Sequence, residues 1–310
     1  RIHLIRAFEE ALLQLEGEGL LHGPAHSSSG HEGGAVGSID LLRSTDLITG
    51  SHRGHHQFLA KGFRHLEVPG YDPLVARLPG QLSDFVHRAL AEILGLDPGF
   101  GHGRGGSMHL RWCEAGAMGT NAIVGGGVLL AAGMAWARQR QGKGDVVFTY
   151  FGDGAVNIGA VPESMNLASL WQLPICFFIE NNCYAVATTL AESTHDPRLS
   201  SRGPGYGIPS FRVDGMDPIA VRIATQMALD TMRSGAGPVV IEADLYRYYH
   251  HSGGLPGSAF GYRSKQEEAA WRERDPVARI AREMIDRGWL TAEQDREVRG
   301  GMVGGMGDVT

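Results

Sequence analysis

The sequence predicts an α/β protein in which a parallel sheet is flanked by helices, and three observations support this fold class. Two short runs, 146–151 and 175–179, are apolar almost throughout and rich in β-branched and aromatic residues, as buried parallel strands are. The segment 161–171 between them carries apolar residues at helical spacing. Hydrophobic residues make up 43% of the chain and charged residues 20%, which is typical of a compact globular protein. The order strand, helix, strand predicts a crossover unit with both strands in one sheet.

Length and composition narrow the classes of protein to which the chain can belong. The 310 residues are enough for one large α/β domain, and we expect a single domain over 1–310. The net charge of −6 provides no broad basic field, so we expect no nucleic-acid partner and no membrane partner. The three cysteines form no CxxC pair, which favours a reducing, cytoplasmic location. No secretory signal is visible, and the longest uncharged apolar run, 123–137, is short for a bilayer span.

The N-terminal third is predicted to form helices joined by a polar loop. Apolar residues recur at helical spacing over 1–18, which predicts an amphipathic packing helix. A loop rich in Gly, Ser and His follows and leads into a second helix near 32–42. His22, His26 and His31 lie in this region, but their spacing fits no zinc pattern, so we expect no zinc site there.

A strand that begins at Asp46 should deliver a cationic group to its carboxyl end. Arg53 follows this strand and precedes Gly54, whose missing side chain lets a phosphate approach the guanidinium. A solvated basic turn is the structural alternative. Further along, 101–106 fits the pattern GxGxxG, but no strand precedes it and no clear helix follows, so a dinucleotide site is not expected.

The remaining elements are predicted from apolar patterns and Asp-Pro helix starts. The Gly/Ala-rich segment 123–137 should be a buried helix and a candidate subunit contact. A helix over 219–234, a strand over 238–246 and a terminal helix after Asp275-Pro276 complete the chain. The Gly/Met-rich tail 300–310 is expected to be loosely ordered.

The strongest functional signal lies at the two strand ends of the crossover unit. The first strand runs into Gly152-Asp153-Gly154 and the second into Glu180-Asn181-Asn182. Because parallel strands end at one edge of a sheet, Asp153 and Asn182 should lie side by side. A carboxylate and an amide oxygen would suit Mg²⁺ holding a diphosphate, and a generic α/β turn is the alternative. Cys183, beside this site, is expected to be a packed residue and not a nucleophile.

The segment GDGAVN followed by ENNCYA resembles the sequence of the alpha subunit of thiamine-diphosphate-dependent 2-oxo acid dehydrogenases. HRGH, GRGGSMH and HHS resemble further segments of that family in the same order, and the resemblance covers about 20–62 and 88–290. It implies the thiamine-diphosphate-binding fold, with thiamine diphosphate and Mg²⁺ as cofactors. The implied reaction is oxidative decarboxylation of a small 2-oxo acid, or oxidation of acetoin, with acyl transfer to a lipoyl group. A split transketolase and a scaffold subunit without cofactor remain as alternatives.

The resemblance also implies roles for individual residues. Asp153, Asn182 and the carbonyl of Tyr184 would hold the metal. His26 and His251 would act at the reacting centre, and His31 occupies a position where the family usually has Gln. The residues that would bind the cofactor are His52, Arg53, Asn121, Ala122, Val124, Gly152, Asp153, Gly154, Ala155, Asn182, Tyr184, Val186 and His251.

Two departures from the family pattern carry further expectations. No segment matches the glutamate that activates the aminopyrimidine, which in the family belongs to a beta subunit. The resemblance therefore implies an α₂β₂ assembly, with a lipoyl-bearing acyltransferase as a further partner. The segment 63–87 is extra, and we expect a surface excursion there that borders the substrate entrance.

Overall fold

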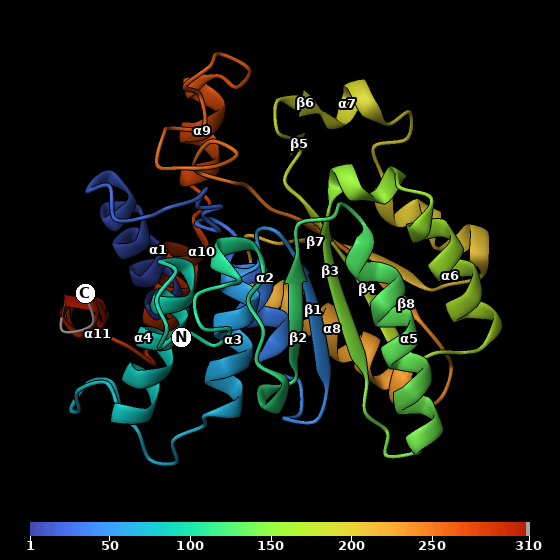
Figure 1. The fold of residues 1–310 in the computed structure, drawn as a ribbon, viewed down its shortest axis with the longest axis horizontal. Helices are drawn as coiled ribbons and strands as arrows, with labels where there is room; N and C mark the ends of the chain where they lie inside the picture. Colours follow the sequence, from blue (N-terminus) through green and yellow to red (C-terminus); the bar gives the residue numbers. More distant parts are fainter. Residues whose placement is uncertain (308–310) are drawn as a thin grey trace.

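The computed structural model describes residues 1–307 and contains a six-stranded parallel sheet, as the sequence predicts (Figure 1). The strand order is β2-β1-β3-β4-β8-β7. The strands are β1 (Leu47–Ser51), β2 (Ala117–Asn121), β3 (Val147–Gly152), β4 (Ile175–Asn181), β7 (Ser210–Asp214) and β8 (Val239–Asp244). A separate antiparallel pair consists of β5 (Tyr184–Ala185) and β6 (Thr188–Thr189).

The strands that follow β1 in the sequence lie on both sides of it in the sheet. Strand β2 lies on one side of β1, and β3 lies on the other side, followed by β4. Crossovers on the two sides of such a switch point leave a crevice outside the carboxyl ends of the strands. The edge formed by the ends of β1, β3 and β4 is therefore where a ligand site is expected.

Helices cover both faces of the sheet and explain why its strands are apolar almost throughout (Figure 1). Ile48, Phe148 and Phe178 belong to the core on one face, and their sequence neighbours Leu47, Val147 and Phe177 belong to the core on the other. The first face is covered by α1 (Ile2–Gly17), α2 (Glu32–Ile39), α3 (His55–His65), α4 (Gly80–Ile93) and α8 (Pro218–Arg233). The second is covered by α5 (Gly126–Gln141) and α6 (Ala160–Leu170).

The predicted Asp-Pro helix starts are present with complete caps. Asp217 accepts hydrogen bonds from the backbone of Ile219 at 2.9 Å and of Ala220 at 3.2 Å, which caps α8. Asp275 does the same for α10. The C-terminal helices are α9 (Lys265–Arg272), α10 (Pro276–Asp286) and α11 (Ala292–Gly307). Within residues 1–307, no helix combines the length and the apolar character that crossing a membrane would require.

The expectation of a loosely ordered tail is wrong for the residues that the structure describes. Helix α11 continues through the Gly/Met-rich stretch to Gly307, and 308–310 lie outside the described residues. Met302 is buried in the same core as α1, and His3 is hydrogen-bonded to Asp295 at 3.0 Å. Burial of the methionine against α1 outweighs the low helix propensity of the glycines.

The extra segment 63–87 does not border the predicted site. Its buried side chains Phe63, Leu82 and Phe85 belong to the main core, so only the loop between α3 and α4 is a surface excursion. The segment lines a second cavity of about 270 Å³ together with α1 and α11. None of its residues lines the cavity at the carboxyl edge of the sheet, and the expectation that it flanks the substrate entrance is not met.

The glycine-rich loop 101–106 wraps around a carboxylate of the same chain. Glu92 of α4 accepts backbone hydrogen bonds from Gly101 at 2.6 Å, Gly103 at 3.0 Å and Gly105 at 2.6 Å. A side chain at Gly105 would meet both His109 backbone and the Glu92 carboxylate. The N–H groups that a dinucleotide phosphate would need are therefore already occupied, which agrees with the sequence-based expectation.

Helix α5 is less buried than the sequence predicts. Its small residues Ala131, Ala132 and Ala135 pack on the sheet, but Leu130 is 58% exposed and Trp136 is 45% exposed. The Gly/Ala-rich pattern thus marks only the inner face, and the outer face is apolar and uncovered in this chain.

Candidate active site

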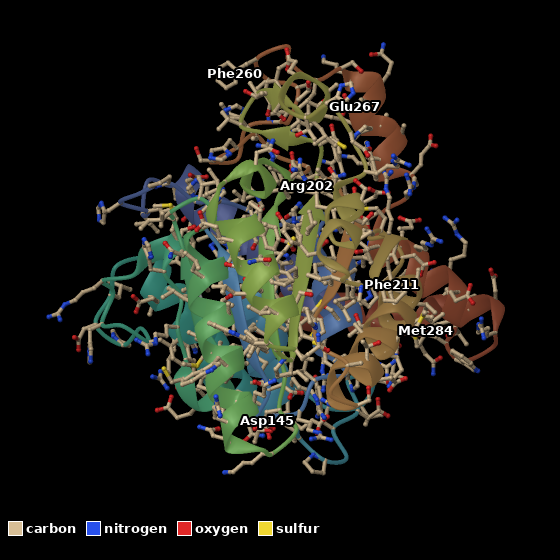
Figure 2. All side chains as sticks on the ribbon, turned by 90° about the vertical axis from the view of Figure 1, so that its right-hand side faces the viewer. Asp145, Arg202, Phe211, Phe260, Glu267 and Met284 are labelled. Atoms are coloured by element: carbon tan, nitrogen blue, oxygen red, sulfur yellow. The ribbon has the colours of Figure 1, made fainter. Side chains whose placement is uncertain are left out.

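A cavity of about 340 Å³ opens at the carboxyl edge of the sheet, between the loops that follow β1, β2, β3, β4 and β8. In Figure 2, Asp145, which precedes β3, lies at the opposite end of the molecule from Phe260 and Glu267, which belong to the segments after β8. All the residues that the sequence predicts for the site line this cavity: His26, His52, Arg53, Asn121, Ala122, Val124, Gly152, Asp153, Gly154, Ala155, Asn182, Tyr184, Val186 and His251.

Asp153 is a buried carboxylate without a cationic partner. It is 3% exposed, and no salt bridge within 4 Å involves it among residues 1–307. Burial raises the pKa of its carboxyl group to about 6, although backbone N–H groups and two nearby guanidinium groups act against the rise. A buried anion in this state fits a bound cation, because an ion at this position would offset the cost of burial. A Cβ at Gly152 would meet no atom within 4 Å, so the cavity is open at the glycine that precedes Asp153.

The loop after β4 adopts strained backbone conformations beside Asp153. Asn182 accepts a hydrogen bond from the backbone of Tyr184 at 3.4 Å, which turns the chain back towards the cavity. Cys183 has φ of 68° and Val186 has φ of 57°, a region that side chains, and β-branched ones in particular, rarely occupy. Burial, followed by the charge of Asp153, raises the pKa of the Cys183 thiol to about 11. The thiol is therefore protonated at neutral pH, as expected for a packed residue.

Arg53 connects the two loops that carry the predicted catalytic histidines. Its guanidinium donates to the carbonyl of Ser27 at 2.6 Å and to the carbonyl of His251 at 2.8 Å. The side chain is 4% exposed, and burial, together with the charge of Arg247, lowers its pKa to about 9. Arg53 remains a cation at neutral pH, and it fixes the positions of segments that lie far apart in the sequence.

Two further buried guanidinium groups lie beside the cavity, and sequence reasoning did not assign them a role. Arg247 is 1% exposed and Arg263 is 3% exposed. Arg263 donates to the carbonyls of Arg247 at 2.6 Å and Tyr249 at 2.8 Å, and Arg247 donates to that of Val186 at 3.0 Å. Over the described part of the chain, neither they nor Arg53 pairs with a carboxylate within 4 Å. Arg247 follows β8 as Arg53 follows β1. Selecting residues that directly follow a predicted strand could therefore have identified it.

Three histidines meet at one wall of the cavity. The ring centroids of His26, His52 and His251 are separated by 4.8, 5.1 and 5.1 Å. Burial first, and the nearby guanidinium groups second, lower the imidazole pKa values, to about 3 for His26, about 2 for His52 and about 4 for His251. All three rings are therefore neutral at neutral pH, and each can both donate and accept a hydrogen bond.

A chain of buried hydrogen bonds supports His26 from behind. The backbone of His26 donates to Ser107 at 3.1 Å, and His55 is hydrogen-bonded to that hydroxyl at 2.9 Å. The other ring nitrogen of His55 lies 2.9 Å from Glu9. Burial alone would raise the pKa of Glu9, but the charge interaction with His55 and the hydrogen bonds to His55 and Ser28 lower it to about 2. This support comes from α1 and α3, and the sequence offered no signal for it.

A second buried cluster, which sequence reasoning also missed, lies at the floor of the cavity. Glu180 accepts from His56 at 2.6 Å and from Gln57 at 2.9 Å, and His31 lies 3.8 Å from the same carboxylate. Burial would raise the Glu180 pKa, but the neighbouring imidazoles lower it below its usual range. His22 is exposed and belongs to neither cluster, and His26 and His31 lie in different clusters.

Comparison with known proteins agrees with this fold and site. The model of the family described as dehydrogenase E1 component matches residues 1–302. The chain is 38% identical over 301 residues to the alpha subunit of the pyruvate dehydrogenase E1 component of Rhizobium meliloti, covering 96% of this chain and 80% of the relative. The corresponding alpha subunit of Zymomonas mobilis is 38% identical over 295 residues, covering 94% and 77%.

A relative with a different printed activity is similar to nearly the same degree. The alpha subunit of acetoin:2,6-dichlorophenolindophenol oxidoreductase of Bacillus subtilis is 37% identical over 263 residues, covering 85% of this chain and 72% of the relative. The chain therefore belongs to the dehydrogenase E1 component family of thiamine-diphosphate-dependent enzymes. It is an alpha subunit of a 2-oxo acid dehydrogenase complex, as the resemblance implied, and the split-transketolase alternative is not favoured.

Proposed function

We propose that the chain, in an α₂β₂ assembly with a beta subunit, oxidatively decarboxylates a small 2-oxo acid and transfers the acyl group to a lipoyl-bearing acyltransferase. Acetoin is the second candidate substrate, because relatives named for pyruvate and for acetoin are about equally similar. The assembly acts in a reducing, cytoplasmic compartment. This chain acts as one domain that supplies the diphosphate half of each site.

The observation that carries the proposal is the charge arrangement around the cavity. A buried carboxylate without a cationic partner, Asp153, shares the cavity with the buried and unpaired guanidinium of Arg53. A diphosphate held by Mg²⁺ would neutralise both, since the carboxylate would bind the metal and the guanidinium would donate to phosphate oxygens. The cavity volume lies within the range of roughly 300–1,000 Å³ that is usual for small-molecule sites.

The residues of this chain fit that cofactor. Asp153, the amide oxygen of Asn182 and the carbonyl of Tyr184 would hold Mg²⁺, and Arg53 with Arg247 would bind the diphosphate. The backbone of Asn121, Ala122 and Val124 would border the aminopyrimidine. When bound, thiamine diphosphate supplies the nucleophilic carbon that activates the carbonyl of the substrate.

The histidines bind and orient the substrate in this scheme. As neutral imidazoles, His26 and His251 donate N–H groups to the substrate carboxylate and to the oxygen on which charge develops. The buried Nδ1 of His26 and Nε2 of His52 have no partner within the described residues, so both atoms are available to a bound molecule. Arg53, through its two carbonyl contacts, keeps the loops of His26 and His251 at a fixed separation.

The test is reductive acylation of a lipoyl domain by the chain reconstituted with its beta subunit, measured against a panel of 2-oxo acids and acetoin. We expect one small substrate to be preferred, and Arg53→Lys, which cannot bridge both carbonyls in the same geometry, to lower kcat with that substrate. Lys265→Arg, at the exposed start of α9, is the matched control. Lipoyl acylation by no member of the panel, with cofactor bound, would contradict the proposed function.

A further inference from the structure

The His26, His52 and His251 cluster has the dimensions of a three-histidine metal site. In a tetrahedral site with metal–nitrogen distances of about 2.0–2.1 Å, the centroids of three bound imidazoles are separated by about 5.2 Å. The observed centroid separations are 4.8, 5.1 and 5.1 Å. One ring nitrogen from each residue lies within 4.8 Å of the other two, so rotation of the rings can bring these atoms onto one ion.

The ring nitrogens are also available for coordination. The Nδ1 of His26 and the Nε2 of His52 are buried and have no hydrogen-bond partner in the described part of the chain. His26 is held by its backbone contact to Ser107, whereas His52 and His251 are only partly buried and line the cavity. Neutral imidazoles carry the free electron pair that a metal needs.

We propose that His26, His52 and His251 form a second metal site that binds Zn²⁺ or a similar transition metal through three imidazoles. This site is chemically distinct from the Mg²⁺ site proposed at Asp153, because imidazole nitrogen favours zinc, cobalt and copper, whereas carboxylate and carbonyl oxygens favour Mg²⁺. Three histidines leave the fourth tetrahedral position open, as in catalytic zinc centres.

The surroundings limit the strength of this site. The Arg53 guanidinium contacts the backbone of His251 and repels any cation placed nearby. The metal therefore binds reversibly and does not act as a resident structural ion. The phosphate groups of the cofactor, if bound as proposed, would reduce this repulsion.

Occupation of the site has a consequence that rests on the proposed function. Two of the three imidazoles, those of His26 and His251, are the ones that would donate hydrogen bonds to the substrate, and a metal bound to their rings would occupy the same space. Zn²⁺ is therefore expected to inhibit the assembled enzyme in competition with the 2-oxo acid. The effect links activity of the enzyme to the concentration of free transition metal.

The first experiment measures metal binding without any activity. The full chain is titrated with Co²⁺ in the presence of excess Mg²⁺, and visible absorption distinguishes the intense bands of tetrahedral Co²⁺ from the weak bands of octahedral Co²⁺. We expect one equivalent of tetrahedral Co²⁺ that is displaced by Zn²⁺. His52→Ala and His251→Asn should each weaken binding by roughly tenfold or more, since each removes one of three ligands.

Control variants separate this cluster from other histidines. His22→Ala, in the exposed part of the same loop as His26, should leave the cobalt spectrum unchanged. His56→Gln, which alters the second buried histidine cluster, should also leave it unchanged. Circular dichroism and thermal melting confirm that each variant is folded. Octahedral cobalt only, or a tetrahedral band that survives both His52→Ala and His251→Asn, would overturn the proposed site.

The second experiment measures inhibition of the reconstituted enzyme by Zn²⁺ at several substrate concentrations. We expect the apparent KM to rise with Zn²⁺ while kcat is retained. A tetrahedral cobalt site in a protein that acylates no lipoyl domain would contradict the proposed function and leave the metal site intact. An active enzyme without a tetrahedral cobalt site would contradict the metal site alone.

Discussion

Asp153 is the residue on which the proposed Mg²⁺ site depends. Replacing it with Ala removes the carboxylate and leaves the diphosphate charge without its divalent partner. Replacing a residue that hydrogen-bonds to a metal ligand typically weakens metal binding roughly 10–100-fold. We expect Asp153→Ala, which removes a ligand itself, to weaken Mg²⁺-dependent binding of thiamine diphosphate by more than this. Isothermal titration calorimetry with and without Mg²⁺ measures this. Wild-type affinity with the same Mg²⁺ dependence would exclude Asp153 as a ligand.

Glu9 should make the stability of the chain depend on pH. Its pKa falls from 4.5 to about 2 in the folded state, so the folded form binds fewer protons than the unfolded form between these values. The contribution is complete above about pH 4.5 and is lost as pH falls towards 2. At 1.36 kcal/mol per unit, it is on the order of 3 kcal/mol. Chemical denaturation of Glu9→Gln between pH 3 and 7 should show a loss of stability that grows with pH up to about 5.

The control for this prediction is the next residue of the same helix. Glu10 is exposed, so Glu10→Gln should change the free energy of unfolding little at any pH. A Glu9→Gln deficit of equal size at pH 3 and pH 7 would indicate lost packing instead of a lost charge.

At single positions, the sequence was most informative where a residue follows a strand. Asp153, Asn182 and Arg53 were identified by that rule together with the family resemblance, and all three line the cavity. Glu180 and His31 also line it but were not selected, because their proximity depends on how α2 and α3 pack against β4. Contacts of that kind leave no local pattern in the sequence.

Among the elements, helix α4 and its following loop act as one unit. The Glu92 carboxylate accepts three backbone hydrogen bonds from 101–105, and bonds to charged groups contribute about 1.5–3 kcal/mol each. We expect Glu92→Ala to destabilise the protein by on the order of 3 kcal/mol or more, since three partly buried backbone donors lose the buried carboxylate that accepts from them. Urea denaturation measures the change. Asp97→Ala, at an exposed position of the same loop, should cost less than about 0.5 kcal/mol.

The sequence predicted most elements but not how completely each is buried. Strands β3 and β4 and helix α6 were placed within two residues, because their apolar patterns are continuous. The tail was predicted as loose and is helical, since its glycines lower local propensity while Met302 packs on α1. The sequence pattern of α5 does not predict whether its outer face is covered, because that depends on contacts outside this chain.

The exposed face of α5 should be a subunit contact. Leu129 and Leu130 are 43% and 58% exposed, and Trp136 on the same helix is 45% exposed. Leu130→Glu should therefore lower the fraction of assembled complex measured by analytical ultracentrifugation. Lys143→Glu, just beyond the helix, is the control for the added negative charge. Unchanged assembly in Leu130→Glu would exclude this face as an interface.

For the whole molecule, the main prediction is that this chain alone is catalytically silent. The family resemblance implies a glutamate from a beta subunit that activates the aminopyrimidine, and no segment of this sequence matches it; proton-transfer groups contribute roughly 10²–10⁴ in rate. The purified chain with Mg²⁺ and thiamine diphosphate should therefore decarboxylate 2-oxo acids slower than the reconstituted complex by a factor of about that size. A rate that does not rise when the beta subunit is added would contradict the split site.

The pairing of β1 with β3 cannot form until well after β1 has been synthesised. Leu47 lies opposite Val147, so 147 − 47 = 100 residues separate partners in adjacent strands. At translation rates of about 5–20 residues per second, β1 leaves the ribosome roughly 5–20 s before β3, the strand with which it pairs. The arginine and histidines that follow β1 therefore exist for that interval without the carboxylate that follows β3. A nascent chain stalled between the two strands carries an unpaired strand edge and no cavity.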